Sequence, residues 1–283
     1  MARTGAPEAP QATGAVGYAF APHATHSAEH HRWVAETWDP VTLPRLAATG
    51  VTRGWRCLDV GTGSGGLARW LAERVGPTGE VIATDLREPT APPTEGVRYL
   101  THDIANDPLP EGKFDLIVAR LVLQHLPSRQ AVLTRLAGAL RPGGWLQIDE
   151  FDTSYEPPLL TPDAAAERLY RKFLAAKSTA LRAAGGHPGW GREVAAAMRN
   201  AGLVAIDPRP LVELRDAASA SLRLQEHHTR HLRSRLLAAG MTDEELAAVR
   251  ELMRDPSFLA CSSVLYSVQG RRPTTHPTTE GSA

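Results

Sequence analysis

The sequence is poor in the features that mark secreted, membrane-spanning and nucleic-acid-binding proteins. Its 283 residues include only two cysteines, Cys57 and Cys261, so no disulfide framework is indicated. It contains no run of about eighteen apolar residues, and we expect no membrane span. The formal net charge is zero, which removes the usual electrostatic basis for binding nucleic acid. The first residues lack the apolar segment of a signal peptide, so we expect a cytoplasmic protein.

Patterns of metal ligands are also scarce, although histidines are numerous. His26 and His30 are four residues apart, as are His227 and His231, and this spacing places two ligands on one helix face. No acid or cysteine completes either pair, and the sequence H-E-x-x-H is absent. We therefore expect no metal site.

A glycine-rich turn follows the first strongly apolar run of the central region, which ends at Val60. Gly61 and Gly63 allow positive φ angles and let a ligand approach the backbone closely. A helix is expected to leave the turn from about Gly65, with unpaired N–H groups facing a polar or anionic ligand group. Asp59 precedes the turn, at the strand end where open α/β sheets bind ligands.

The glycine spacing alone leaves the ligand open. Gly61, Gly63 and Gly66 also fit the dinucleotide pattern G-x-G-x-x-G, and a single match to that pattern is weak. Asp59 favours a ligand with an amine or a sulfonium over one with a pyrophosphate. An NAD(P) oxidoreductase and a tight turn without any ligand stay as alternatives.

Strands alternate with helices through the central region, which predicts an α/β fold with a parallel sheet. The apolar runs predict strands at residues 56–60, 80–84, 97–101, 114–119, 145–149, 203–212 and 260–269. Helical spacing predicts helices at about 27–38, 41–48, 65–75, 128–140, 161–184, 190–200 and 217–239, with another after a capping box at Thr242. We expect Asp39 and Pro40 to end the first helix.

The chain is expected to divide into a core with additions at both ends. We expect mobile tails at 1–15 and 271–283, a helical lid at 16–50 and a core at 51–270. Two insertions, at about 152–190 and 215–240, interrupt the regular alternation and are expected to form the substrate pocket.

The stretch Leu58-Asp59-Val60-Gly61-Thr62-Gly63-Ser64-Gly65 resembles the first motif of class I S-adenosylmethionine-dependent methyltransferases. Asp85 after the second strand, Asp103 after the third, Phe114–Val118 and Arg141-Pro142-Gly143-Gly144 follow in the order of that family. The resemblance covers about residues 51–151. Residues 18–38 and 258–273 resemble small-molecule methyltransferases of bacterial specialised metabolism. The resemblance implies a Rossmann-like seven-stranded, mostly parallel sheet with helices on both faces and an antiparallel last strand.

The resemblance also implies which residues hold the methyl donor, S-adenosylmethionine. Asp59 and the turn residues Gly61, Thr62 and Gly63 would hold its amino-acid end, which Tyr18 and Arg120 would also approach. Asp85 would accept hydrogen bonds from the ribose hydroxyls and Leu86 would pack on the adenine, while Asp103 and the N–H of Ile104 would bind the adenine edge. Arg120 has the alternative of a structural ion pair.

For the acceptor, the resemblance implies a small organic molecule methylated on O, N or C. His125, one helical turn beyond Arg120, and Glu150, at a strand end, are the candidate catalytic groups. Tyr155, His227, His228 and His231 are the candidate acceptor contacts, and the alternative for the last three is a solvated basic helix. A homodimer and a non-catalytic, cofactor-binding regulatory protein stay open.

Overall fold

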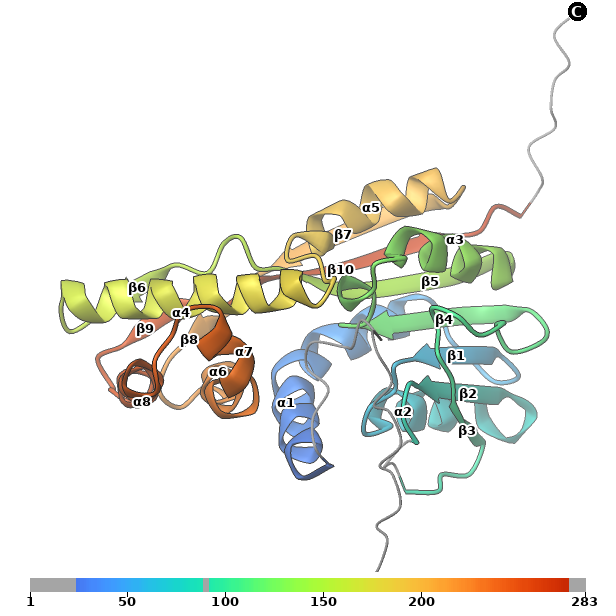
Figure 1. Ribbon diagram of the computed structural model, residues 1–283. Coiled ribbons are helices and arrows are strands. Elements are labelled where there is room, and N and C mark those ends of the chain that lie inside the picture. The colour runs from blue at the N-terminus through green and yellow to red at the C-terminus, as the bar shows by residue number, and fades with distance from the viewer. Residues whose placement is uncertain (1–23, 89–91, 275–283) are drawn as a thin grey trace, which may run out of the picture.

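The computed structural model describes residues 24–88 and 92–274, with side chains from residue 29 onward. Its centre is a seven-stranded sheet in the order β3-β2-β1-β4-β5-β10-β7 (Figure 1). The strands are β1 (Arg56–Val60), β2 (Glu80–Asp85), β3 (Val97–Thr101), β4 (Phe114–Arg120), β5 (Leu140–Asp152), β7 (Val204–Leu211) and β10 (Val264–Arg271). Neighbouring strands from β3 to β5 pair in parallel, and β10 pairs antiparallel with both β5 and β7. The predicted Rossmann-like sheet with an antiparallel last strand is confirmed.

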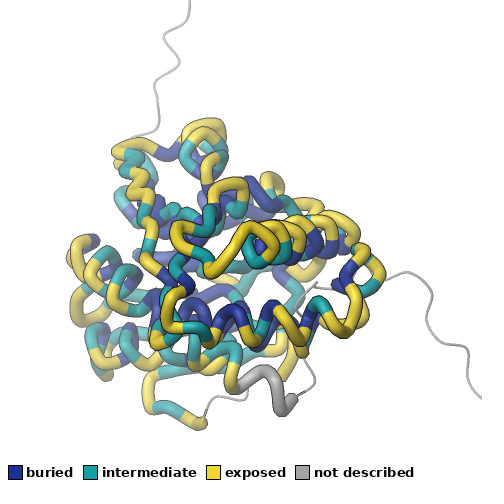
Figure 2. The backbone as a smooth tube through the Cα atoms, turned by 90° about the vertical axis from the view of Figure 1, so that its left-hand side faces the viewer, coloured by how far each residue is buried: buried dark blue, intermediate teal, exposed yellow. Residues whose placement is uncertain are grey.

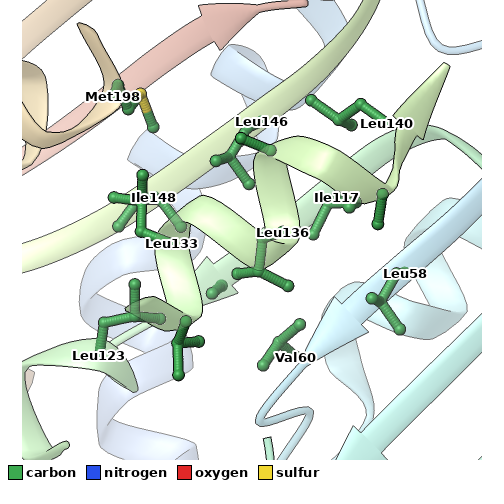
Figure 3. Close-up of a cluster of buried hydrophobic side chains, with 14 of the residues drawn as sticks. Leu58, Val60, Ile117, Leu123, Leu133, Leu136, Leu140, Leu146, Ile148 and Met198 are labelled. Carbon is green, nitrogen blue, oxygen red and sulfur yellow. The ribbon is translucent and has the colours of Figure 1, made fainter. Parts of the chain in front are cut away.

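Helices cover both faces of this sheet. The helices α1 (Ala24–Ala48) and α2 (Gly66–Val75) bury Leu46 and Leu71 against one face, followed by the one-turn η1 (Gly76–Thr78). The helices α3 (Arg129–Ala139) and α5 (Trp190–Asn200) cover the other face. In Figure 3 the side chains of α3 gather over those of β1, β4 and β5. Because both faces are covered, the strands β1 and β4 are almost wholly buried, as their apolar runs predict.

A second group of elements, which we call the cap, lies beyond the carboxyl ends of the parallel strands (Figure 1). It contains α4 (Ala164–Ala183), α6 (Ala220–His231), α7 (Arg233–Ala238), α8 (Asp243–Leu252) and a small sheet of β6 (Pro158–Leu160), β9 (Leu259–Cys261) and β8 (Leu214–Arg215). The cap has its own core around Tyr170, Phe173 and Phe258. Figure 2 shows exposed turns on its outside and buried segments within.

The first described helix differs from the prediction. The helix α1 continues through Pro40 and Pro44 to Ala48, although proline removes a helical hydrogen bond. Its buried residues Trp38, Thr42 and Leu46 recur every fourth position and share one face. Packing of this face outweighs the cost of the prolines, and α1 contacts both the sheet strand β10 and the cap helix α6.

Three other boundaries are corrections. The helix α4 begins at Ala164, where Asp163 accepts the N–H of Ala166, rather than at residue 161. The helix expected at 217–239 divides into α6 and α7, and the strand expected at 260–269 divides into β9 and β10. The predicted capping box between Thr242 and Glu245 is confirmed at the start of α8. None of the described helices is long and apolar enough to cross a bilayer.

Candidate active site

The glycine turn between β1 and α2 needs glycine for two separate reasons. Gly61 and Gly63 have φ angles of 70° and 55°, in the left-handed region. A Cβ on Gly61 would lie 2.3 Å from Val122 Cγ2, and a Cβ on Gly63 would lie 2.9 Å from His31 Nε2. Any other side chain at either position would therefore meet both backbone strain and a collision.

The first N–H groups of this turn are hydrogen-bonded to the neighbouring strand β2. Gly61 and Thr62 both donate to the carbonyl oxygen of Thr84, at 2.8 and 2.9 Å, and Gly63 donates to Asp85 Oδ2 at 2.9 Å. These three N–H groups fix the turn to β2, whereas the unpaired N–H groups were expected at the start of the helix, from about Gly65. The turn is thus a cradle whose shape is fixed by hydrogen bonds within the protein, and Asp85 is the charged side chain bonded to it.

Asp59 lies beneath the turn and is almost completely buried. Its Oδ2 accepts a hydrogen bond from the Thr62 hydroxyl at 2.6 Å. Burial raises the pKa of Asp59 to about 6, against the opposing effects of Thr62 and of the Arg120 charge. Asp59 therefore stabilises the turn directly, and its contact with a donor stays a prediction.

Asp85 and Asp103 lie at the ends of the neighbouring strands β2 and β3, which are joined there by a 2.7 Å hydrogen bond from the His102 N–H to the Asp85 carbonyl. Leu86 is 55% exposed beside Asp85, as a residue that packs on a ligand would be, whereas Ile104 is buried against the core. We call the glycine turn with Asp59, Asp85 and Asp103 the glycine edge.

Some hydrogen-bond acceptors of the glycine edge already have partners within the protein. Asp103 accepts hydrogen bonds from the Ala105 N–H and from the Asn106 side-chain amide at 2.9 and 2.8 Å, which shapes its own turn. Each carboxylate oxygen can accept more than one hydrogen bond, so Asp85 and Asp103 keep capacity for a ligand. Their roles toward a donor stay predictions.

The helix α1 packs over the glycine edge. Arg120, at the end of β4, forms an ion pair with Asp39 of α1 at 2.7 Å and donates to Thr42 Oγ1 at 3.3 Å. The structural alternative for Arg120 is thus observed, and its contact with a donor stays a prediction. His31 packs against Gly63, where burial lowers its pKa and the nearby Asp85 opposes that shift. Tyr18 lies outside the described residues.

A cavity opens between the glycine edge and the cap, with about 760 Å³ of space that includes its open part. We call it the cap cavity. Its apolar walls are formed by Val34, Trp38, Leu121, Phe151, Leu174, Leu181 and Leu224. Two pairs of neighbouring residues connect it with the glycine edge. His30 and Leu121 line the cavity, while His31 and Val122 contact the turn glycines.

Leu121 marks this junction in another way. Its φ of 57° is in the left-handed region, which is uncommon for a residue other than glycine. Its N–H donates to the Asp149 carbonyl at 2.9 Å, so β5 holds the strained turn in place. Backbone strain of this kind concentrates at functional sites, where surrounding contacts enforce it.

The two candidate catalytic residues occupy different positions. His125 lines the cap cavity from the one-turn helix η2 (Leu123–His125), and burial together with the Arg129 charge lowers its pKa to about 3. Glu150 is fully buried, and its Oε1 accepts N–H groups from three residues of this turn, Val122, Leu123 and Gln124, at 2.6–3.3 Å. Burial raises the pKa of Glu150 to about 8. Glu150 thus holds the turn that carries His125, and is not among the described residues that line the cavity.

The four candidate acceptor contacts also occupy different positions. His228 lines the cap cavity, with its ring centre 5.5 Å from that of His30. His227 points instead to Glu29, at 3.4 Å, and its ring stacks on His231 at 5.8 Å. Tyr155 is 55% exposed. Of these four residues, only His228 is among the described residues that line the cavity. The alternative of a solvated helix is therefore wrong for His227 and His228, which are buried.

Sequence reasoning missed three charged residues of the cavity wall, Glu156, Lys177 and Arg215. A signal for Lys177 was present, because it shares a helical face with Tyr170, Phe173 and Leu181, all buried on α4. A lysine in an otherwise apolar stripe is unusual. No comparable pattern distinguishes Glu156 or Arg215. Within residues 24–88 and 92–274, no group of three or more histidine, cysteine or acidic side chains could hold a metal ion.

Comparison with known proteins supports a single family. A family model described as a methyltransferase domain matches residues 30–207. The methyltransferase str3 of Strobilurus tenacellus is 34% identical over 110 residues, 38% of this chain and 39% of the relative. The ubiquinone/menaquinone biosynthesis C-methyltransferase UbiE of Cupriavidus necator is 31% identical over 121 residues, 40% of this chain and 49% of the relative. The chain thus spans less than half the length of these two relatives.

Solved structures share the fold at low identity. The phosphoethanolamine N-methyltransferase 2 of Haemonchus contortus, in complex with S-adenosyl-L-methionine, is 15% identical with a TM-score of 0.51, covering 88% of this chain and 57% of that chain. The YcgJ protein of Bacillus subtilis is 16% identical with a TM-score of 0.52, covering 82% and 98%. Since the family model matches more than half of the chain, this protein belongs to the methyltransferase-domain family, with the fold of class I S-adenosylmethionine-dependent methyltransferases.

Proposed function

We propose that this protein transfers a methyl group from S-adenosylmethionine to an O, N or C atom of a small organic acceptor. The observation that carries the proposal is the adjacency of two different spaces. A glycine cradle with a partly exposed acid, Asp85, borders a largely apolar cavity, and the pairs His30–His31 and Leu121–Val122 belong to both. The first space suits the polar donor and the second an apolar acceptor.

The donor residues would be those of the glycine edge. Asp85 would accept hydrogen bonds from the ribose, Leu86 would pack on the adenine, and Asp103 with the Ile104 N–H would bind its edge. S-adenosylmethionine supplies an activated methyl group, which the acceptor's lone pair takes in one in-line displacement while the sulfonium becomes a neutral thioether. The protein's task is chiefly to align the two molecules, which can be worth about 7–11 kcal/mol.

The histidines that line the cavity are weak bases. Burial lowers the pKa of His30 and of His125 to about 3, and that of His228 also falls well below its usual value. These imidazoles stay uncharged and accept protons poorly, so they suit hydrogen bonding to the acceptor. An acceptor that is already deprotonated, or a neutral amine whose methylated product releases its proton to solvent, needs no stronger base. Catalytic roles for His125 and Glu150 remain part of the proposal.

Methyl transfer is tested directly with a panel of phenols and amines, by following the thioether product S-adenosylhomocysteine. We expect turnover of at least one acceptor and binding of S-adenosylmethionine but not of NAD by calorimetry. Tight NAD binding without donor binding would restore the oxidoreductase alternative. Donor binding with no turnover of any panel member would favour a non-catalytic, regulatory protein.

The proposal includes a cytoplasmic location and a homodimer. Both described cysteines are free, which fits a reducing compartment. Leu159, Leu160 and Leu214 are each more than half exposed on the small cap sheet, and such an apolar patch suits a self-complementary contact. Light scattering of the parent and of a Leu160→Asp, Leu214→Asp variant tests the dimer, and a monomeric parent would exclude it.

A further inference from the structure

One wall of the cap cavity carries an ion network that the donor chemistry does not require. Glu156 precedes β6, Lys177 lies on α4 and Arg215 lies on β8, so all three belong to the cap. Arg215 Nη1 and Glu156 Oε2 form an ion pair at 2.8 Å, with side chains only 2% and 3% exposed. Ser263 donates its hydroxyl to the other oxygen of Glu156. Each oxygen of the Glu156 carboxylate therefore already has a hydrogen-bond partner within the protein.

Lys177 has a different environment. It is half-buried, and its ammonium donates a hydrogen bond to Gln225 Oε1, a neutral oxygen. Among the described residues, no acid lies within ion-pair distance of Lys177. Burial lowers the pKa of Lys177 to about 8, because the attraction of Glu156 only partly offsets burial and the repulsion of Arg215. The amine is thus still mostly charged at neutral pH.

A charge count follows from these contacts. The wall holds two cations, Lys177 and Arg215, and one carboxylate, Glu156, which already pairs with Arg215. The cavity histidines His30, His125 and His228 are uncharged at neutral pH, for the reason given above. Glu213 also interacts with the charge of Arg215, but it is not among the described residues that line the cavity. The residues that line the cap cavity therefore carry one net positive charge at neutral pH.

We propose, on the basis of the proposed function, that the acceptor is an organic acid whose single anionic group binds Lys177 on the cap wall while its nucleophilic atom faces the glycine edge. His30 and Leu121 line the cavity next to His31 and Val122, which contact the turn glycines, whereas Lys177 lies on the cap helix α4, so the acid is an anchor and not the methylated group. The apolar residues that line the cavity, such as Trp38 and Phe151, suit an aromatic or aliphatic body. A neutral acceptor would leave the partly desolvated ammonium of Lys177 to share the single carboxylate of Glu156 with Arg215, which is costly.

Matched pairs of probes test the charge preference. Each pair is a hydroxylated aromatic carboxylic acid and its primary amide, for example 4-hydroxybenzoate with 4-hydroxybenzamide and 4-hydroxyphenylpropionate with its amide. Their binding to protein saturated with S-adenosylhomocysteine is measured by calorimetry, and their methylation by product formation. We expect the parent to prefer the acid at least tenfold in binding and in kcat/KM.

Variants on one helix assign the preference to Lys177. We expect Lys177→Met to remove it, lowering affinity for the acid tenfold or more and leaving the amide within about threefold, while Lys177→Arg retains it. Lys172→Met is the matched control, because Lys172 lies on the outer face of α4 and pairs with Glu245. It should behave like the parent. Unchanged affinity for S-adenosylhomocysteine shows that each variant is folded.

Two results would overturn the inference. One is a parent that, when saturated with S-adenosylhomocysteine, shows no preference for the acid over the amide in any pair, whether it binds both equally or neither. The other is a Lys177→Met variant that lowers both affinities alike. In either case, intact binding of S-adenosylhomocysteine and methylation of any neutral acceptor would leave the proposed function standing. Loss of donor binding and of all methylation in the parent itself would contradict the proposed function instead.

Discussion

The glycine edge and the cap cavity lie side by side, but the first is formed mainly by backbone and the second by side chains. The edge consists of backbone turns at adjacent strand ends, fixed by short hydrogen bonds within a few residues of Gly61 and Asp85. The cavity consists of side chains from α1, η2, β5, α4, α6 and β8, which are far apart in the sequence. A space defined by backbone suits an invariant ligand, whereas one defined by side chains can be altered without disturbing the sheet.

The largest expected effect tests whether the two regions have separate cores. Phe258 is fully buried in the cap, with its ring centre 4.9 Å from that of Tyr170. Phe258→Ala should lower the free energy of unfolding by about 3–5 kcal/mol, because it leaves a cavity in a packed cluster. Chemical denaturation measures this loss. We expect donor affinity to survive at temperatures where the variant is folded, and a variant that is folded but cannot bind donor would show that the regions are not separable.

The next effect concerns the glycine edge alone. Asp85→Ala should weaken binding of S-adenosylmethionine by roughly 2–4 kcal/mol, since hydrogen bonds from ribose hydroxyls to a charged group are lost. The change also removes the bond from the Gly63 N–H. Calorimetry measures the affinity, and Asp207→Ala, which breaks a surface ion pair with Arg45, is the control. Unchanged affinity would remove Asp85 from the site.

The turn that joins the two regions should show a distinctive pH dependence. Glu150 has an unfolded pKa near 4.5, raised to about 8 in the fold by burial, so the native state binds the extra proton between these values. Its contribution to stability is full below about pH 4.5 and is lost as pH rises toward 8, by about 1 kcal/mol per pH unit. Glu150→Gln keeps an oxygen for the three N–H groups but does not titrate.

Denaturant titrations of parent and Glu150→Gln from pH 5 to pH 8 measure this difference. The parent should lose stability relative to the variant as pH rises, because other titrating groups cancel in the comparison. A constant difference across the range would show that the carboxyl of Glu150 keeps one protonation state throughout.

The smallest expected effect comes from His31, which covers Gly63 from α1. His31→Ala should weaken donor binding by less than about 1 kcal/mol, since the main contact that it removes is packing against the turn. The neighbouring exposed Arg32→Ala is the control. A loss of more than tenfold in donor affinity, measured by calorimetry, would mean that His31 binds the donor directly.

The same contrast explains what the sequence could predict. The glycine edge was predictable, because Asp59, the turn glycines and Asp85 lie at fixed offsets from apolar strands. The mostly parallel sheet was predictable from the alternation of strands and helices, and its antiparallel last strand from the family resemblance. The continuation of α1 through Pro40 was not, because it depends on Trp38 packing against Phe151 and Leu265, which are more than a hundred residues away.

The cap cavity was predictable only in outline. Both insertions expected to form it contribute to its walls, since Lys177 and His228 come from them. Which side chains point inward was not predictable for α6, where His228 lines the cavity and His227 points to Glu29. Neighbours on a helix differ by about 100°, and only the tertiary contacts decide which one is directed inward.

The most direct test of the account asks whether the two regions bind different reactants. Ser178 lines the cap cavity on α4, so Ser178→Phe should fill the cavity, with Ser178→Ala as its control. Steady-state kinetics with the best panel acceptor would compare these variants with Asp85→Ala. We predict that Ser178→Phe raises KM for the acceptor at least tenfold with the donor KM unchanged, and that Asp85→Ala does the reverse. If both variants raise the KM of the same reactant, the assignment of donor and acceptor to separate regions is wrong.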